Sequence, residues 1–238
     1  MLLRTAARGP DGCSVIFANA SAGVEVAVPW FEPRYWMTRA ALVASGKGRG
    51  AATIFEHGGR RFVLRHYLRG GLAAMLSRDR YLWLGESHTR PLAEMQLMLR
   101  LNAAGLPVPL PVAARYERLG TSYRADLITE FLHDTATLAE RLDAGVVSPA
   151  TWTAVGRCIR RFHDYGLCHA DLNARNILLR GDEEVFLIDF DRAVRRKPGL
   201  WCDANLARLR RSLDALEDGR SEPGFSEEHW QHLLAGWF

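Results

Sequence analysis

Lysine is almost absent from this chain: Lys47 and Lys197 are its only two, so arginine supplies nearly all of the positive charge. The 31 basic residues outnumber the 27 acidic ones only slightly, for a net charge of +4, and the arginines are interspersed with acidic residues. A nucleic-acid-binding protein would show a concentrated basic stripe, so that class is disfavoured. The weak excess remains compatible with an anionic ligand or an acidic membrane surface.

Cysteine is also scarce. Cys13, Cys158, Cys168 and Cys202 form no CxxC pair and no Cys/His quartet, which argues against a zinc site or a disulfide framework and favours a reducing compartment. The N-terminal segment lacks the apolar core of a signal peptide, and no run of roughly 18 apolar residues occurs, so we expect no membrane-spanning segment. Peripheral attachment to a membrane stays open. With 48% apolar and 24% charged residues, the composition is that of a folded domain and not of a disordered chain.

The first half of the chain is dominated by short β-type segments. Residues 51–55 and 61–67, separated by the turn signal Gly58-Gly59, predict a hairpin. A helix is expected over residues 90–104, where Gly105 ends it, followed by an extended proline-rich stretch and a strand over 123–132.

The second half is mainly helical. Helices are expected over 138–142, 152–165, 205–216 and 227–237, with two short strands at 177–179 and 185–188. Ser148-Pro149 opens the second helix in cap and first-turn positions, and Gly166 ends it. The pattern predicts an α+β protein with a β-rich N-terminal lobe, residues 1–132, and a small helical C-terminal lobe, residues 133–238.

The strongest chemical signal is the octapeptide His169–Asn176 (HADLNARN), followed by Ile188–Asp191 (IDFD). Phosphoryl transfer needs a group to take the proton of the attacking hydroxyl and metal ions on the phosphates. Asp171 is the expected base, while Asn176 and Asp189 offer the hard oxygen ligands that Mg²⁺ prefers. The separation of Asp171 from Asn176 follows the kinase catalytic-loop pattern D-x-x-x-x-N.

Any one of these residues alone would more often be an ordinary turn residue. Their combination, with apolar strands on either side, favours the catalytic interpretation. His169 is expected to be a structural hydrogen-bonding residue, because Asp171 already fills the role of base. Asp191 is either a second acidic ligand or a capping carboxylate.

The stretch HADLNARNILL…LIDFD resembles the catalytic and metal-binding motifs of the protein-kinase-like superfamily, and is most similar to those of the lipopolysaccharide kinases. Further matching segments, from about Phe31 to Leu213, are ASGKGRG, FVLRHYLRGGL, RYLW, GLPVPLPVAA, YRADLITEFL and WCDANLARLRRSL. The resemblance implies a bilobal protein-kinase-like fold with ATP and Mg²⁺ as cofactors.

The same resemblance assigns the nucleotide-binding residues. The glycine-rich turn over the phosphates would consist of Gly46, Lys47, Gly48 and Gly50. Arg65 stands where a typical kinase has the phosphate-binding lysine, with Glu94 as its ion-pair partner; Lys47 is the alternative phosphate ligand. Backbone groups around Glu130 and Leu132 would meet the adenine edge, although an ordinary buried strand explains that segment equally well.

Three departures from typical protein kinases bear on the acceptor. Ala170 replaces the arginine of the catalytic loop, DFD replaces DFG, and no A-P-E sequence follows Asp189. A regulatory phosphorylation loop and a peptide platform are therefore not expected, which favours a small or lipid-linked acceptor. Arg80, Arg90 and Arg175 are candidates for binding its anionic groups.

The family resemblance implies transfer to the 4-hydroxyl of a 3-deoxy-D-manno-octulosonic acid (Kdo) residue on Kdo–lipid A precursor, in lipopolysaccharide core biosynthesis. It also implies that the protein associates peripherally with the cytoplasmic face of the inner membrane. Two alternatives stay open. One is a kinase for a heptose, an aminoglycoside or another small alcohol. The other is a non-catalytic pseudokinase, which is suggested by Arg65 in the place of the usual kinase lysine. The aromatic segment Trp30–Trp36 fits either a membrane interface or plain core packing.

Overall fold

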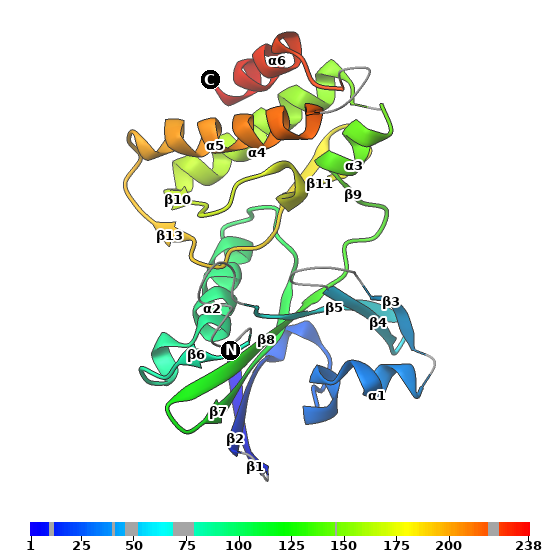
Figure 1. The fold of residues 1–238 in the computed structure, drawn as a ribbon, viewed down its shortest axis with the longest axis vertical. Helices are drawn as coiled ribbons and strands as arrows, with labels where there is room; N and C mark the ends of the chain where they lie inside the picture. Colours follow the sequence, from blue (N-terminus) through cyan, green and yellow to red (C-terminus); the bar gives the residue numbers. More distant parts are fainter. Residues whose placement is uncertain (10–11, 40, 46–51, 69–78, 146, 219–223) are drawn as a thin grey trace. The chain divides into compact units, whose positions relative to one another are not determined.

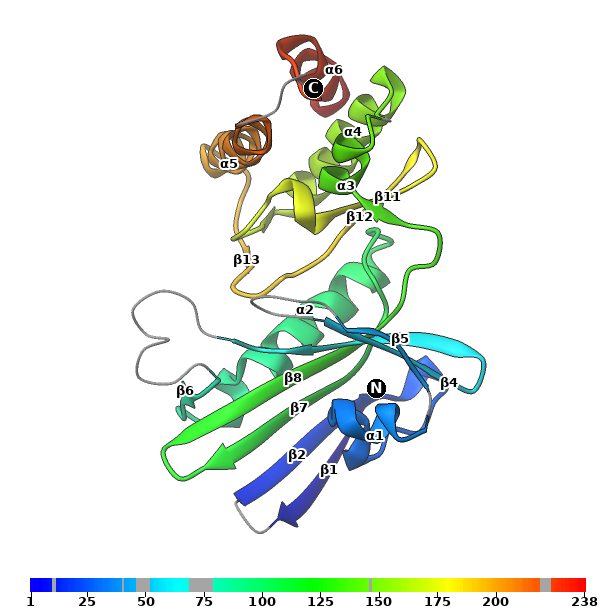
Figure 2. The same cartoon turned by 45° about the vertical axis from the view of Figure 1, so that its right-hand side comes forward.

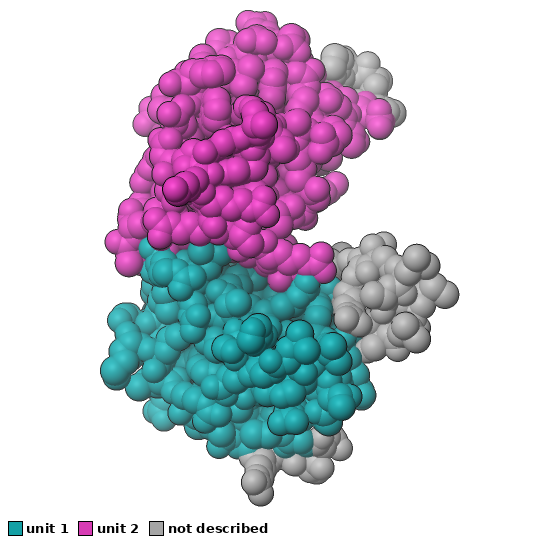
Figure 3. All heavy atoms as spheres, turned by 90° about the vertical axis from the view of Figure 1, so that its left-hand side faces the viewer, with its two compact units in different colours: residues 1–100, 109–131 teal, residues 101–108, 132–238 magenta. Residues whose placement is uncertain are grey.

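The structure is a computed structural model that describes residues 1–9, 12–39, 41–45, 52–68, 79–145, 147–218 and 224–238 (Figure 1). The chain forms two compact units, coloured separately in Figure 3. Unit 1 consists of Met1–Arg100 and Pro109–Phe131, and unit 2 of Leu101–Val108 and Leu132–Phe238. A sheet-based unit and a mainly helical unit confirm the expected α+β class.

Unit 1 is built on an eight-stranded antiparallel sheet with the order β1-β2-β7-β8-β5-β4-β3, and β6 also pairs with β8 (Figure 2). Its strands are β1 (Leu2–Gly9), β2 (Gly12–Asn19), β3 (Leu42–Ser45), β4 (Ala52–His57), β5 (Arg60–His66), β6 (Tyr81–Leu82), β7 (Pro111–Leu119) and β8 (Ser122–Glu130). The helical elements are η1 (Ala20–Ala22), η2 (Val28–Phe31), α1 (Pro33–Met37), η4 (Glu86–His88) and α2 (Arg90–Ala103), whose last three residues are assigned to unit 2.

The predicted hairpin is strands β4 and β5. Gly58 and Gly59 form its two-residue turn with φ values of 59° and 73°. Both lie in the left-handed region that glycine adopts without steric cost and that a tight hairpin turn requires. By contrast, the β1–β2 hairpin, which extends the sheet beyond β7, was not predicted from the sequence.

The two faces of β5 carry different chemistry, because successive side chains of a strand point to opposite sides. Arg65 lies on the face that contacts α2, through Glu94. Phe62 and Leu64 lie on the other face, in an apolar cluster with aromatic side chains from η2 and α1. Trp30, Phe31 and Trp36 are at most 3% exposed, so they form core packing and not a membrane-facing surface.

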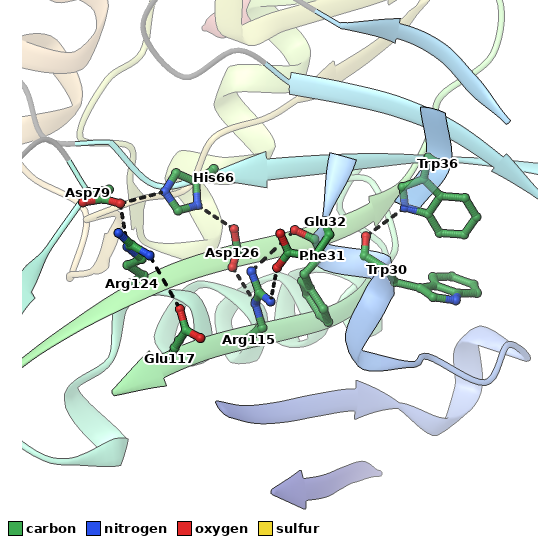
Figure 4. A network of polar contacts seen from close by, with 10 residues as sticks. All are labelled: Trp30, Phe31, Glu32, Trp36, His66, Asp79, Arg115, Glu117, Arg124 and Asp126. Atoms are coloured by element: carbon green, nitrogen blue, oxygen red, sulfur yellow. Dashed lines mark hydrogen bonds and ion pairs between the residues drawn. The ribbon is translucent and has the colours of Figure 1, made fainter. Parts of the chain in front are cut away.

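Next to this apolar cluster, the same face of the sheet carries a network of ion pairs (Figure 4). The Nδ1 atom of His66 lies 2.6 Å from Oδ1 of Asp126, and the other carboxylate oxygen accepts a 2.8 Å bond from Nε of Arg115. Arg115 also donates to Glu32 at 2.8 Å. Asp126 is nearly inaccessible, so the Arg115 guanidinium and the hydrogen bond with His66 offset the cost of burying its charge.

The described residues of unit 2 form four α-helices, one short 3₁₀-helix and two small sheets, of strand order β12-β11-β9 and β10-β13. Its elements are β9 (Ala136–Thr137), α3 (Leu138–Asp143), α4 (Pro149–Tyr165), β10 (Leu167–Cys168), η5 (Ala174–Asn176), β11 (Ile177–Arg180), β12 (Glu184–Leu187), β13 (Val194–Arg195), α5 (Trp201–Glu217) and α6 (Glu227–Trp237). All four predicted helices are present; α4 begins at the expected cap, and α5 begins about one turn earlier than expected.

Helix α4 begins and ends at the expected signals. The Ser148 side chain caps it by accepting from the Thr151 backbone N–H, and Pro149 occupies the first turn. Gly166 ends it with a φ of 85°. Helices α4 and α6 pack so closely that a Cβ on Gly156 would lie 1.9 Å from the carbonyl oxygen of Leu233. Within the described ranges, no helix is both long and apolar enough to cross a membrane.

Candidate active site

The predicted catalytic loop lies in unit 2, between β10 and β11, and its backbone is fixed by its own side chains. Asn173 caps η5: its Oδ1 accepts from the N–H groups of Arg175 and Asn176. Its Nδ2 donates to the carbonyl oxygen of Asp171 at 3.1 Å. The loop geometry is therefore set locally, by one asparagine that bonds on both sides of the turn.

Asn176 lies next to Asp171, as a kinase catalytic loop requires. Its Nδ2 donates to the Asp171 carbonyl oxygen at 2.9 Å. This bond uses the amide nitrogen and leaves the amide oxygen as the predicted ligand atom.

His169 joins the catalytic loop to the segment that carries Asp189. Its Nδ1 accepts a 3.1 Å bond from the backbone N–H of Asp171, and its Nε2 donates to the carbonyl oxygen of Ile188 at 3.0 Å. Burial lowers the pKa of His169, so the imidazole is neutral and carries its proton on Nε2. His169 thus has the structural role expected for it. The Ile188 N–H also donates to the Asn176 carbonyl oxygen, so Asp171, Asn176 and Ile188, which directly precedes Asp189, belong to one hydrogen-bonded assembly.

Asp189 has a φ of 63°, a conformation uncommon outside glycine. Such backbone strain is often found where a side chain must be aimed at a functional site. No group of three or more His, Cys, Asp or Glu side chains in the described ranges forms a metal cluster. Mg²⁺ in phosphoryl transfer needs only one or two protein ligands beside the phosphates and water, so the donor pair Asn176 and Asp189 fits it. Asp191, two residues further on, is partly exposed, and its role stays open.

Helix α5 supports the loop through residues to which the sequence assigned no role. Asn205 donates to the backbone carbonyl oxygen of His169 and accepts from its N–H, both at 3.1 Å. The Ser212 hydroxyl accepts from the Ala174 N–H at 3.2 Å. Arg208 donates to the Asp171 carboxylate. All three lie within the segment WCDANLARLRRSL, and their spacing of three and four residues is the signal of a shared helix face.

In unit 1, Arg65 and Glu94 form the expected ion pair. The Glu94 side chain is 2% exposed, and it also accepts a 2.5 Å bond from the Tyr67 hydroxyl. The Arg65 guanidinium carbon lies 4.7 Å from the centre of the Tyr67 ring. The buried Glu94 carboxylate, which also accepts from Tyr67, fixes the orientation of the Arg65 guanidinium. Contact of Arg65 with a nucleotide stays a prediction.

The other predicted nucleotide-binding residues are less closely defined. Gly46, Lys47, Gly48 and Gly50 lie outside the described residues. Glu130 ends β8; its N–H donates to the Leu110 carbonyl oxygen at 2.9 Å, and its carboxylate pairs with Arg60. The carbonyl oxygen of Leu132 accepts from the Thr135 hydroxyl at 2.8 Å. The adenine-binding role of this segment stays a prediction.

The three arginines proposed for acceptor binding occupy separate positions. Arg80 is exposed beside β6, and Arg175 is exposed within η5. The Arg90 guanidinium lies over the Tyr81 ring, 4.6 Å from its centre, at the start of α2. Arg80 and Arg90 belong to unit 1 and Arg175 to unit 2, and their role in acceptor binding stays a prediction.

A likeness to a solved structure bears on the fold. The structure of a spectinomycin phosphotransferase in complex with ADP and spectinomycin matches 82% of this chain and 72% of that one, with a TM-score of 0.50. At 10% sequence identity, this match concerns the fold alone, and it confirms the expected kinase-like architecture.

Sequence comparisons identify the family. A 3-deoxy-D-manno-octulosonic acid kinase of Stenotrophomonas maltophilia (strain K279a) is 46% identical over 91% of this chain and 87% of its own. Proteins of the same name from Xanthomonas axonopodis pv. citri (48% identical; 84% and 80% covered) and Haemophilus influenzae strain 86-028NP (39%; 90% and 91%) match similarly. The model of the lipopolysaccharide kinase (Kdo/WaaP) family matches residues 33–237. This chain therefore belongs to the lipopolysaccharide kinase (Kdo/WaaP) family.

Proposed function

We propose that this protein transfers the γ-phosphoryl group of ATP to the 4-hydroxyl of a Kdo residue on Kdo–lipid A precursor. The observation that carries the proposal is the near full-length similarity to proteins named 3-deoxy-D-manno-octulosonic acid kinase. The hydrogen-bonded assembly of Asp171, Asn176 and the Ile188-Asp189 segment supports it, because these are the residue types that phosphoryl transfer uses.

The residues have separate roles in this reaction. Asp171 accepts the proton of the acceptor hydroxyl as that oxygen bonds to the γ-phosphorus, and the bond from the γ-phosphorus to the β–γ bridging oxygen breaks to release ADP. Arg65, oriented by Glu94, binds phosphate oxygens. Asn176 and Asp189 would hold Mg²⁺, which would neutralise charge on the phosphates.

The test is a transfer assay on a defined acceptor. Purified protein with ATP and Mg²⁺ should add one phosphate to Kdo–lipid A precursor, as seen by mass spectrometry, and NMR should place it on the 4-hydroxyl. Precursor lacking Kdo, a heptose and spectinomycin serve as comparison acceptors. Asp171→Asn should reduce the rate by about 10²–10⁴-fold.

The outcomes separate the alternatives. Preferential phosphorylation of the heptose or of spectinomycin would assign a different acceptor. Nucleotide binding without turnover on any acceptor, with Asp171→Asn indistinguishable from wild type, would make the protein a non-catalytic binding module.

Peripheral contact with the anionic cytoplasmic face of the inner membrane is part of the same proposal. A lipid-linked acceptor requires the enzyme to work at a membrane surface. Leu82 and Leu84 support this, since they are 62% and 66% exposed and lie close in sequence to the exposed Arg80. Co-sedimentation with vesicles should require anionic lipid and should weaken in a Leu82→Ser/Leu84→Ser variant; equal binding to neutral vesicles would contradict it.

A further inference from the structure

One face of α5 holds the catalytic loop at three successive points. Asn205 accepts a hydrogen bond from the His169 N–H and donates one to the His169 carbonyl oxygen. Arg208 donates to the Asp171 carboxylate, and the Ser212 hydroxyl accepts from the Ala174 N–H. Leu209 and Leu213, from the same helix, are fully buried and anchor it within unit 2. The helix is therefore a fixed support, and Arg208 is the one residue of the three that touches the predicted base itself.

The contact between Arg208 and Asp171 has a specific geometry. Nε and Nη2 of Arg208 lie 3.1 and 2.5 Å from the same carboxylate oxygen, Oδ1. Among the residues that the structure describes, none donates a hydrogen bond to Oδ2. The two side chains are 46% and 49% exposed, so the pair lies at the surface and not in the core of unit 2.

The backbone of Asp171 is already fixed by other groups. Its N–H donates to His169 and its carbonyl oxygen accepts from Asn173 and Asn176. The freedom left to Asp171 is rotation of its side chain, which is broad at the terminal carboxylate torsion. Arg208 removes that freedom. Because an exposed ion pair adds little to folding stability, its main consequence lies in this orientation.

We infer that Arg208 is a positioning residue for phosphoryl transfer: it holds Oδ1 of Asp171 so that Oδ2 faces the acceptor hydroxyl. In the transfer step the hydroxyl proton moves to Oδ2 while the hydroxyl oxygen bonds to the γ-phosphorus and ADP leaves. Arg208 takes no proton and forms no covalent bond. The inference rests on the proposed kinase activity.

The first test compares variants of one helix. Arg208→Gln removes the charge, Arg208→Lys keeps it on a single donor group, and Arg211→Gln is the matched control on an exposed position of α5. We expect Arg208→Gln to lower kcat by about 10–100-fold, with KM for ATP within about twofold of wild type, since misplacement of a catalytic group by about 1 Å costs about this much. Arg208→Lys should recover part of the loss, and Arg211→Gln should match wild type. An unchanged kcat in Arg208→Gln would overturn the inference.

The second test asks whether Arg208 acts through Asp171. In the Asp171→Asn background, adding Arg208→Gln should change the rate by less than about twofold, because the group that Arg208 orients no longer works as a base. If the rate of the double variant is instead reduced by the product of the two single reductions, Arg208 acts on the substrate directly or only stabilises the fold. That result would overturn the inference.

The design also separates this inference from the assignment of the acceptor. The double-mutant cycle is measured on Kdo–lipid A precursor and, in parallel, on ATP hydrolysis with water as acceptor. If the precursor is not phosphorylated but the cycle on hydrolysis is non-additive, only the acceptor assignment fails. If the effects of the two substitutions on the activation free energy are additive in both reactions, the role of Arg208 is overturned, whereas the kinase assignment is unaffected.

Discussion

Arg65 of β5 and Glu94 of α2 form an ion pair, as expected from the sequence resemblance, which matches them to the lysine–glutamate pair of typical kinases. The Glu94 carboxylate is almost inaccessible to solvent and is shared with the Tyr67 hydroxyl, whereas Arg65 keeps 21% of its side chain exposed. The pair therefore has one buried member and one that reaches solvent. This arrangement suits a guanidinium that is oriented by the buried Glu94 carboxylate and can bind phosphate oxygens on its exposed side.

Replacing Arg65 should weaken ATP binding and destabilise unit 1. Arg65→Ala removes a cationic partner from the buried Glu94 carboxylate, a change that costs about 3–5 kcal/mol in comparable buried pairs. We expect a KM for ATP at least about tenfold higher, by the cost of one charge-assisted hydrogen bond, with Arg65→Lys intermediate. Lys47→Ala is the comparison: a larger rise in KM for Lys47→Ala than for Arg65→Lys would assign phosphate binding to the lysine.

Substitution of the predicted metal ligands should change the dependence of the rate on Mg²⁺ concentration more than its dependence on ATP concentration. Chelation of Mg²⁺ should abolish transfer, and Asp189→Asn or Asn176→Ala should raise the Mg²⁺ concentration that gives the half-maximal rate, since each variant removes a hard oxygen ligand. Asp203→Asn, on the exposed start of α5, is the control. Unchanged Mg²⁺ titrations in both variants would refute this ligand assignment.

His163 should make the protein less stable in acid. Its Nδ1 accepts a 3.0 Å bond from Nε1 of Trp237, and burial lowers its pKa to about 4. The unfolded chain, with a His pKa near 6.5, binds the proton more readily, so stability falls as the pH drops below about 6.5. The loss should be on the order of 2 kcal/mol at pH 5.

The measurement is denaturant unfolding between pH 4.5 and 7.5, with His163→Gln as the variant. Its stability should be lower at neutral pH and should depend less on pH in the acid range. An acid dependence equal to that of wild type would show that His163 does not cause it.

His66 should have the opposite pH dependence. Its hydrogen bond with the Asp126 carboxylate raises its pKa, so the folded state holds the proton more tightly than the unfolded chain does. This contribution is fully present below pH about 6.5 and is lost as the pH rises through the folded-state pKa. NMR titration of the His66 ring should give a midpoint above the ordinary histidine value of about 6.5. His66→Gln should remove the fall in stability between neutral and alkaline pH; persistence of that fall would contradict the assignment.

Gly156→Ala should destabilise unit 2 by about 1–3 kcal/mol, the usual cost of overpacking, or by more. The added Cβ would lie 1.9 Å from the Leu233 carbonyl oxygen and 2.9 Å from the Trp237 nitrogen, so α4 and α6 would have to separate. Gly199→Ala is the matched control, because the nearest atom to its Cβ, the Lys197 carbonyl oxygen, is 4.0 Å away. Equal melting temperatures for the two variants would show that the helix contact is not tight in solution.

The sequence by itself determined the local features of this protein. The Gly58-Gly59 turn, the Ser148 cap and the Gly166 stop act within a few residues, so the hairpin and α4 were predictable from composition and spacing. The catalytic loop was predictable because Asp171 and Asn176 are separated by a fixed number of residues, and the Arg65–Glu94 pair followed from a resemblance that supplies both positions.

Only the tertiary structure decided which distant groups meet. The bond from His169 to the Ile188 carbonyl oxygen and that from Arg208 to Asp171 join residues 19 and 37 positions apart. The pairing of β2 with β7, which carries the unpredicted N-terminal hairpin into the sheet, and the burial of Asp126 also depend on distant segments. Periodicity and turn chemistry report how a segment is shaped, but the partner of a polar side chain is fixed by which elements pack together. For that reason the residue types of the predicted site were visible in the sequence, and their support by α5 was not.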